Sequence, residues 1–175
     1  NETDGRAIHP TPVVGCVGLL DDVRIVPATW RHGDVVLLAG DARLSLDGSA
    51  YQSVYGELAG RPAPLELEAE AALIDFLRRN APRCSLVHDA ADGGLAVALA
   101  EAAVSSGIGA ELDLPVDPLS LFGEGGGQAV IACAPEVAGE LAGTVPLRVL
   151  GEVGGDSICG VALTAARSAW EVRGS

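Results

Sequence analysis

The amino-acid sequence predicts an α+β domain in which a mixed β-sheet is flanked by helices. Segments of strand type and helical segments follow one another in the order strand, helix, strand, helix, strand, strand, helix, strand, strand. This order lacks the regular alternation of a doubly wound parallel fold. Apolar residues make up 49% of the 175 residues, enough for a sizeable core, whereas aromatic residues make up only 3%. The core is therefore expected to consist of Val, Leu, Ile and Ala.

Two parts of unequal size are expected. Residues 1–30 are predicted to be the tail of a preceding domain plus a linker, with a strand over residues 13–20. A turn at residues 31–34 opens the main domain, which is predicted over residues 31–175. The chain contains no methionine, not even at its first position, so we expect a piece of a longer protein.

The main domain is expected to begin with a buried strand and a long helix. Residues 35–39 are consecutively apolar, which is typical of a strand buried on both faces. Residues 45–63 lack periodicity and predict a loop with a short helix near residues 53–58. A helix follows over residues 65–79, where apolar side chains recur at helical spacing. Its predicted buried stripe consists of Leu67, Ala71, Ile74 and Leu77.

The second half of the main domain carries most of the predicted strands. These strands cover residues 84–87, 108–114, 128–133, 147–150 and 158–163. Helices are predicted over residues 95–105 and 135–141. The first of these helices is expected to bury Leu95, Ala98, Leu99 and Ala102. The glycine-rich residues 151–156 predict a hairpin turn between the last two strands.

The charge balance excludes several classes of partner. With 24 acidic residues against 11 basic residues, the formal net charge is −13. Because no basic patch is available to neutralise phosphates, binding to nucleic acid or to an anionic membrane is not expected. A nucleotide ligand remains compatible, since Mg²⁺ bridges carboxylates and phosphates. No signal peptide and no membrane span is recognised in the sequence.

The four cysteines form no Cys-x-x-Cys pair, which argues against a zinc or redox motif. Each cysteine lies in an apolar segment, so buried free thiols in a cytoplasmic protein are expected. The cysteines are Cys16, Cys84, Cys133 and Cys159.

A predicted strand-to-helix turn over residues 88–95 combines two aspartates with two glycines, in the order His-Asp-Ala-Ala-Asp-Gly-Gly-Leu. Glycines let a ligand approach the backbone, and free N–H groups at a helix start attract phosphate. Asp89 and Asp92 are of the type that holds the Mg²⁺ accompanying phosphate. The alternative is a tight turn in which Asp92 caps the helix. His88 is interpreted as a satisfied core residue in preference to a base or a metal ligand.

A second glycine-rich segment, residues 121–127, contains three consecutive glycines immediately before a predicted strand. Glycine at these positions costs conformational entropy, so the loop is expected to lie close to a ligand or to another part of the backbone. No Gly-x-x-x-x-Gly-Lys-Ser/Thr phosphate loop and no Gly-x-Ser-x-Gly nucleophile motif is present. A nucleotide would therefore have to be held by backbone N–H groups, Mg²⁺ and acidic residues.

Taken together and in order, several segments resemble phosphoribosylformylglycinamidine synthase, the large synthetase subunit of purine biosynthesis. The run His-Asp-Ala-Ala-Asp-Gly-Gly-Leu-Ala-Val-Ala-Leu-Ala-Glu is the most specific of them. The resemblance covers nearly the whole chain. The segments are residues 1–3, 9–15, 18–22, 48–51, 88–101 and 121–124.

The resemblance implies the C-terminal domain of the second half of such an enzyme, with a fold like the C-terminal domain of AIR (aminoimidazole ribonucleotide) synthase. It implies a ligase that uses ATP, Mg²⁺ and ammonia to convert formylglycinamide ribonucleotide into formylglycinamidine ribonucleotide, ADP and phosphate. The implied partners are the N-terminal domains of the same parent chain, a glutaminase subunit or domain and a small accessory subunit. The fragment alone is expected to be inactive, and its parent is expected in the cytoplasm.

The resemblance also implies site residues. Asp89 corresponds to a Mg²⁺ ligand, and no catalytic residue is assigned. In the first half of the family, a Glu-Ser-Gln loop at the position of residues 124–126 contacts substrate, whereas here Glu is followed by two glycines. The residues implied to bind the nucleotide or its phosphates are Asp92, Gly93, Gly94, Glu124, Gly125 and Gly126.

Two alternative functions stay open. Gly125 and Gly126 replace two hydrogen-bonding side chains, which favours a non-catalytic structural or docking domain around an auxiliary nucleotide site. A metal-dependent phosphatase is the other alternative, because Gly40-Asp41 and Asp92-Gly93 loosely resemble its acidic metal motifs.

Overall fold

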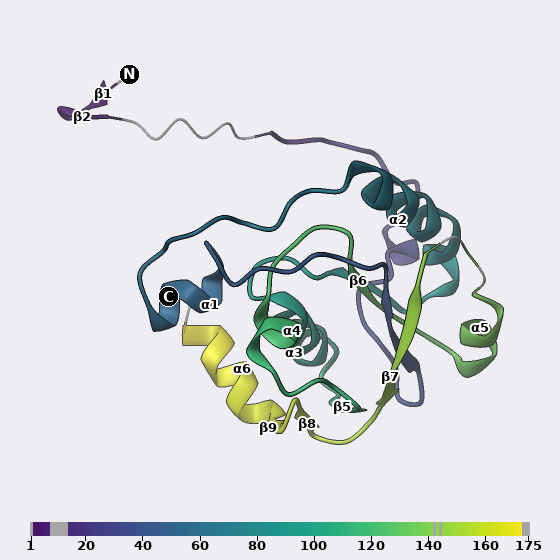
Figure 1. The fold of residues 1–175 in the computed structure, drawn as a ribbon. Coiled ribbons are helices and arrows are strands. Elements are labelled where there is room, and N and C mark those ends of the chain that lie inside the picture. Colours follow the sequence, from purple (N-terminus) through teal and green to yellow (C-terminus); the bar gives the residue numbers. More distant parts are fainter. Residues whose placement is uncertain (1, 8–13, 142, 144, 173–175) are drawn as a thin grey trace.

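A five-stranded sheet with the strand order β4-β6-β3-β7-β5 forms the centre of the domain (Figure 1). The structure is a computed structural model that describes residues 2–7, 14–141, 143 and 145–172. The strands are β3 (Val35–Ala39), β4 (Leu86–Asp89), β5 (Ala110–Leu112), β6 (Ala129–Cys133) and β7 (Leu147–Val153). The predicted α+β class, helices packed on a sheet, is confirmed.

The strand directions in this sheet differ from those of the mixed sheet that was predicted. Each of the four neighbouring pairs is antiparallel. The order of strands and helices along the chain does not determine which strands become neighbours, and β6 lies between β4 and β3 although both precede it in sequence. The prediction of mixed directions was therefore wrong, while the predicted bounds of the central strand β3 are confirmed.

Both faces of the sheet are covered by helices, which explains why β3 is apolar at every position. Val36 and Leu38 face the cluster that contains helix α3, and Leu37 and Ala39 face the cluster that contains helix α2. Successive side chains of a strand point to opposite faces, so two covered faces require a continuous apolar run. In Figure 1, α3 and α6 lie on one side of the sheet, and α2 and α5 lie on the other.

Helix α3 (Gly94–Ser106) is almost entirely apolar because it is packed between the sheet and two further helices. Its four residues predicted to be buried are all buried, as are several others. The neighbouring helices are α4 (Pro118–Phe122) and α6 (Leu163–Val172), neither of which was predicted. Arg167 of α6 donates to the carbonyl oxygen of Val104 at 2.8 Å and so ties α6 to α3.

Helix α2 (Leu67–Asn80) covers the opposite face with α5 (Pro135–Glu140), but not through its predicted stripe. The fully buried residues of α2 are Leu73 and Phe76. Leu67 and Ile74, which were predicted to be buried, are 71% and 63% exposed. The predicted stripe was therefore wrong at Leu67, Ala71 and Ile74, whereas Leu77 is half-buried against the same cluster as Phe76.

The C-terminal strands pair differently from the predicted hairpin. β7 pairs with β3 and β5, whereas β8 (Ser157–Ile158) pairs with β9 (Val161–Ala162). Residues 154–156 connect β7 to β8 without pairing them, so the predicted hairpin turn was wrong. The remaining elements are β1 (Glu2–Thr3), β2 (Arg6–Ala7), the 3₁₀ turns η1 (Val23–Ile25) and η2 (Ala81–Arg83), and helix α1 (Ala50–Tyr55).

The segment that precedes β3 lies along the outer edge of β4. Ala28 forms an antiparallel bridge with Leu86, and Val87 donates its amide to the carbonyl oxygen of Pro27 at 2.8 Å. Trp30 is only 2% exposed and belongs to the core. Residues 14–20 form no strand, and residue 13 lies outside the described part of the chain. The predicted boundary at residue 31 stays a prediction, with the last residues before it packed on the domain.

The cysteines are free, as predicted, but their burial differs from the prediction. Cys133 is buried and Cys84 is half-buried, whereas Cys16 and Cys159 are exposed. The expectation of buried thiols was therefore wrong for Cys16 and Cys159, because the apolar segments around them lie outside the central sheet. Among the helices in the described part of the chain, none has the length and hydropathy needed to cross a lipid bilayer.

Candidate functional site

The two glycine-rich segments meet at one end of the central sheet. Ala129 at the start of β6 is paired with Asp89 at the end of β4 and with Ala39 at the end of β3. Antiparallel pairing therefore places the loops after β3 and β4 beside the loop before β6. The amide of Ala90 donates to the carbonyl oxygen of Gln128 at 3.2 Å, which continues this pairing beyond the strands. Helices α1 and α3 both begin at this end.

The turn between β4 and α3 needs both of its glycines. Gly93 and Gly94 have φ angles of 82° and 68°, a region that side chains disfavour. A Cβ atom on Gly94 would also lie 2.6 Å from the carbonyl oxygen of Gly123. Gly93 occupies the N-cap position of α3 without a side-chain cap. The alternative in which Asp92 caps this helix was therefore wrong, and the Asp92 side chain is exposed to solvent.

The amides of Gly93 and Gly94 at this helix start are occupied by protein acceptors. The Gly93 amide donates to Oε1 of Glu124 at 2.8 Å, and the Gly94 amide donates to the carbonyl oxygen of Ala91 at 3.0 Å. The expectation that these two amides are free to receive a phosphate is wrong for this structure. Whether Gly93 and Gly94 approach a ligand in another way stays a prediction.

Glu124 connects several segments of the site. Its Oε1 also accepts from the amide of Ala50, the first residue of α1, at 2.7 Å. Its backbone pairs with Ser45: each amide donates to the other residue's carbonyl oxygen, at 2.9 and 3.0 Å. Sequence reasoning missed the participation of Ala50 and Ser45. The available signal was the Gly-Ser-Ala-Tyr segment, in which Ser49 caps α1.

The glycine run after Glu124 is explained by close approach of other protein groups. A Cβ atom on Gly125 would collide with the carbonyl oxygen of Arg43, and one on Gly126 would collide with the carboxylate of Glu70. Of the two predicted reasons for this run, contact with another part of the backbone is thus confirmed at Gly125. Within residues 2–7, 14–141, 143 and 145–172, the amides of Gly125 and Gly126 donate to no acceptor.

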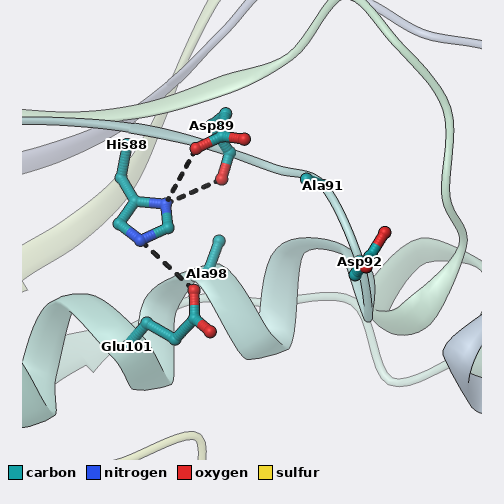
Figure 2. A pocket seen from close by; sticks show the side chains of 6 residues that line it. All are labelled: His88, Asp89, Ala91, Asp92, Ala98 and Glu101. Atoms are coloured by element: carbon teal, nitrogen blue, oxygen red, sulfur yellow. Dashed lines mark hydrogen bonds and ion pairs between the residues drawn. The ribbon is translucent and has the colours of Figure 1, made fainter. Parts of the chain in front are cut away.

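A pocket of about 230 Å³ opens beside the turn, between β4 and α3. Figure 2 shows the imidazole of His88 between two acidic groups. Its Nε2 lies 3.3 Å from Oε2 of Glu101, and its Nδ1 lies 2.7 Å from the carbonyl oxygen of Asp89. His88 is therefore held by polar partners at the edge of the core. The pocket is lined by His88, Asp89, Ala91, Asp92, Ala98 and Glu101.

Carboxylates dominate the charge of this pocket. Asp89, Asp92 and Glu101 line it, and no basic side chain other than His88 does. A phosphate next to these three groups would be repelled unless a cation lay between them. Glu101 was missed as a site residue by sequence reasoning, although it is the sole charged residue of α3.

The carboxylates of the pocket fit a Mg²⁺ ion whose other ligands come from a nucleotide and from water. The Asp89 side chain is 82% exposed and offers its carboxylate to solvent. Among the described residues, no three His, Cys, Asp or Glu side chains are close enough to hold a metal ion by themselves. Mg²⁺ is commonly held by one or two carboxylates together with phosphates and waters. The residues present therefore fit a cation that arrives with its phosphates.

This fold and this turn define a class of protein. The family model described as AIR synthase related protein, C-terminal domain, matches residues 31–163. Because the match covers most of the chain, the chain belongs to this family.

Two relatives of this chain are both named phosphoribosylformylglycinamidine synthase subunit PurL. The chain is 45% identical over 170 residues to phosphoribosylformylglycinamidine synthase subunit PurL of Thermobifida fusca (strain YX), covering 90% of this chain and 22% of that protein. It is 42% identical over 171 residues to the PurL subunit of Methylocella silvestris, covering 90% of this chain and 23% of that protein. The chain thus spans less than a quarter of the length of these relatives.

Solved structures of PurL from Thermotoga maritima share the fold. The structure complexed with FGAR has a TM-score of 0.65 at 18% identity, covering 80% of this chain and 29% of that chain. The structure complexed with AMPPCP has a TM-score of 0.58 at 18% identity, covering 80% and 26%. The PurLQS structure has a TM-score of 0.55 at 17% identity, covering 75% and 24%. At these identities the likeness shows the fold alone.

Proposed function

We propose that this chain is the C-terminal domain of the second half of a purine-biosynthesis ligase. The parent enzyme converts formylglycinamide ribonucleotide, ATP and glutamine-derived ammonia into formylglycinamidine ribonucleotide, ADP and phosphate. The observation that carries this proposal is the 45% identity, over 90% of the chain, to a PurL subunit. The fragment supplies one wall of a nucleotide site and is inactive without the rest of the parent.

The acidic turn after β4 is the part of the site that holds the cation. Asp89 would provide a carboxylate ligand to Mg²⁺, and Asp92, which lines the same pocket, would help to hold the phosphates that accompany the cation. The three carboxylates of the pocket favour this arrangement, because they attract a divalent cation and repel an unaccompanied phosphate. When bound, ATP would supply the phosphoryl group that activates the amide oxygen of the substrate, and Mg²⁺ would neutralise the charge of its phosphates.

The glycine loop before β6 offers a second set of contacts. The amides of Gly125 and Gly126 donate to no acceptor within the described residues, so they are available to oxygen atoms of a nucleotide. Gly93 and Gly94 contribute by allowing the tight turn that carries Asp89 and Asp92, because a Cβ atom on either would collide with Val97 or Gly123. The chain's own residues thus bind and orient, while the reacting groups come from the parent's other domains.

Partners of the domain follow from the same relatives. The PurLQS structure from Thermotoga maritima supports an assembly in which the PurL subunit works with two further subunits. We infer that the parent's N-terminal domains, a glutaminase and a small accessory subunit are the partners of this chain. With a formal net charge of −13 on this chain, nucleic acid and an anionic membrane are not among the proposed partners. We place the assembly in the cytoplasm, the location that the resemblance to the family implies.

A non-catalytic role is the second candidate function. In this alternative the domain completes the body of the enzyme around an auxiliary nucleotide that is not consumed. The observation that favours it is that the loop after Glu124 presents glycine backbone instead of side chains that select a substrate. No observation of comparable weight favours a metal-dependent phosphatase.

Substitutions in the full-length parent separate these functions. We expect Asp89→Asn to weaken Mg²⁺–ATP binding, measured by calorimetry, by about tenfold or more, since it removes a charged metal ligand. Ammonia-dependent synthesis of the amidine is measured on the same variant. Loss of both readouts supports a catalytic nucleotide site, and loss of binding with full activity supports the auxiliary site. Unchanged binding contradicts both. Asp156→Asn, at an exposed aspartate between β7 and β8, is the matched control.

A further inference from the structure

Glu124 joins the starts of two helices through a single oxygen atom. Its Oε1 accepts from the Gly93 amide at 2.8 Å and from the Ala50 amide at 2.7 Å. Gly93 is the N-cap residue of α3, and Ala50 is the first residue of α1. Hydrogen bonds from N–H groups to an ionised carboxylate are among the stronger ones in proteins. The two helix starts are therefore held at a fixed position relative to each other.

The backbone of Glu124 is itself anchored at this point. Its amide and carbonyl both bond to Ser45, in the loop between β3 and α1. The carboxylate consequently extends from a fixed base, and its Oε1 adds a hydrogen bond to the turn after β4, where Gly94 also packs against the backbone of residues 121–123. Removing this side chain would take one hydrogen-bonded contact from the turn that carries Asp89 and Asp92 and so loosen it, while leaving the base in place.

The same contacts make Oε1 a poor ligand for a cation or a phosphate. Amides at a helix start attract negative charge, and here that position is filled by the protein's own carboxylate. A cation at Oε1 would have to approach beside two N–H donors that point at the same atom. A phosphate at these amides would have to displace Glu124.

We propose that Glu124 is a positioning residue, which acts through Gly93 on the aspartates of the turn and does not itself bind the nucleotide or the metal. This inference rests on the proposed nucleotide site and replaces a direct ligand role for Glu124. It explains why a glutamate is present in a loop whose next three residues have no side chain. The role of the carboxylate is to accept two N–H groups that are distant in sequence.

Glutamine and alanine distinguish positioning from ligation. Glu124→Gln keeps a carbonyl-type oxygen at the same reach and so retains both acceptor contacts, but it removes the negative charge. Glu124→Ala removes the contacts and the charge together. A positioning residue is rescued by glutamine, whereas a charged Mg²⁺ ligand is not.

The test uses the full-length parent and the Mg²⁺ dependence of ATP binding. We expect Glu124→Ala to raise the Mg²⁺ concentration required for half-saturation by about tenfold, the usual effect of losing a group that orients a metal ligand. We expect Glu124→Gln to stay within about threefold of the parent, a difference well below the loss of an ionic ligand. If glutamine is as damaging as alanine, Glu124 is a ligand and the inference is overturned. If alanine is harmless, it is overturned as well.

A second readout does not depend on nucleotide binding. Amide hydrogen exchange of the same parent, read by mass spectrometry, reports on peptides around Gly93 and Ala50. Both peptides should exchange faster in Glu124→Ala than in Glu124→Gln. Faster exchange in Glu124→Ala, found while Asp89→Asn leaves Mg²⁺–ATP binding unchanged, would contradict the proposed function. The contacts of Glu124 with Gly93 and Ala50 would still be supported. If exchange is equal in both variants, the positioning role fails whatever the nucleotide does.

Discussion

The imidazole of His88 and the carboxylate of Glu101 connect the central sheet to helix α3, with Nε2 3.3 Å from Oε2. Their side chains are 27% and 29% exposed, so the contact lies at the border between core and pocket. Glu101 is the sole charged residue of an otherwise apolar and serine-containing helix. The pairing therefore gives a half-buried carboxylate a partner that it would otherwise lack.

Loss of this contact is expected to have a small effect on stability. Glu101→Ala should lower the free energy of unfolding by about 1 kcal/mol, because the pair keeps partial access to water. Glu101→Gln should lower it less, since the side-chain amide can either accept from or donate to Nε2. Urea unfolding followed by circular dichroism measures both values. A loss above about 3 kcal/mol for alanine would mean that the pair is far better shielded from water than its exposure indicates.

The two glycines at the ends of α3 offer a matched pair of substitutions. Gly94 has a φ of 68° and no room for a Cβ atom, whereas Gly107 has a φ of 71° and nothing within 4 Å of that position. Gly107→Ala should cost about 1 kcal/mol from backbone strain alone. Gly94→Ala should cost about 2–4 kcal/mol, because steric overlap with the backbone of residues 121–123 is added. Equal losses in thermal or urea unfolding would refute the predicted overlap.

The two tryptophans are expected to respond very differently to truncation. Trp30 is 2% exposed and donates its indole N–H to the carbonyl oxygen of Ile108 at 2.9 Å, whereas Trp170 is 53% exposed. Trp30→Ala should lower the free energy of unfolding by about 3–5 kcal/mol. Trp170→Ala should lower it by less than about 1 kcal/mol. The prediction is wrong if a fluorescence-monitored urea titration gives the two variants the same midpoint.

The thiol of Cys84 is expected to resist alkylation near neutral pH. Burial, and next to it the neighbouring Cys133 thiol, raises the pKa of Cys84 to about 11. A raised pKa favours the protonated form in the folded state, so any stability linked to this proton is present below about pH 9 and is lost as the pH rises towards 11. Because the thiolate is the reactive form, labelling should accelerate over the same range.

Mass spectrometry of iodoacetamide-treated protein measures this behaviour peptide by peptide. The exposed Cys16 is the internal reference and should be labelled first. The half-buried Cys84 should follow only as the pH approaches its pKa. Equal labelling of both thiols at about pH 8 would contradict the shielding of Cys84.

Segments with a single dominant pattern were predictable from the sequence. The consecutive apolar residues 35–39 correspond to β3, and the nearly uncharged run after Gly94 corresponds to α3. Helix α2 was located but its buried face was not, because Leu67 and Ile74 compete with Leu73 and Phe76 for the sheet. Helix α6 was missed, since its first residue, Leu163, fits equally well as the end of a strand.

The candidate site was predictable in its position but not in its contacts. The two glycine-rich segments were recognised, and pairing of β4 with β6 brings them together. The contacts of Glu124 with Gly93 and Ala50 link residues 31 and 74 positions apart, and local composition carries no information about such pairs. The expectation of a free amide failed at Gly93 for this reason.

The segment along β4 has a consequence for association between molecules. A strand at the border of a sheet exposes unpaired N–H and C=O groups that invite pairing with another chain. Here the bridge from Ala28 to Leu86 and the bond from Val87 to Pro27 cover that border, while the opposite border strand is only three residues long. The side chain of Trp30, which follows residues 27–28, is buried in the core and anchors this segment to the domain. Detaching this segment would thus expose the unpaired N–H and C=O groups of β4 and make the domain prone to aggregation.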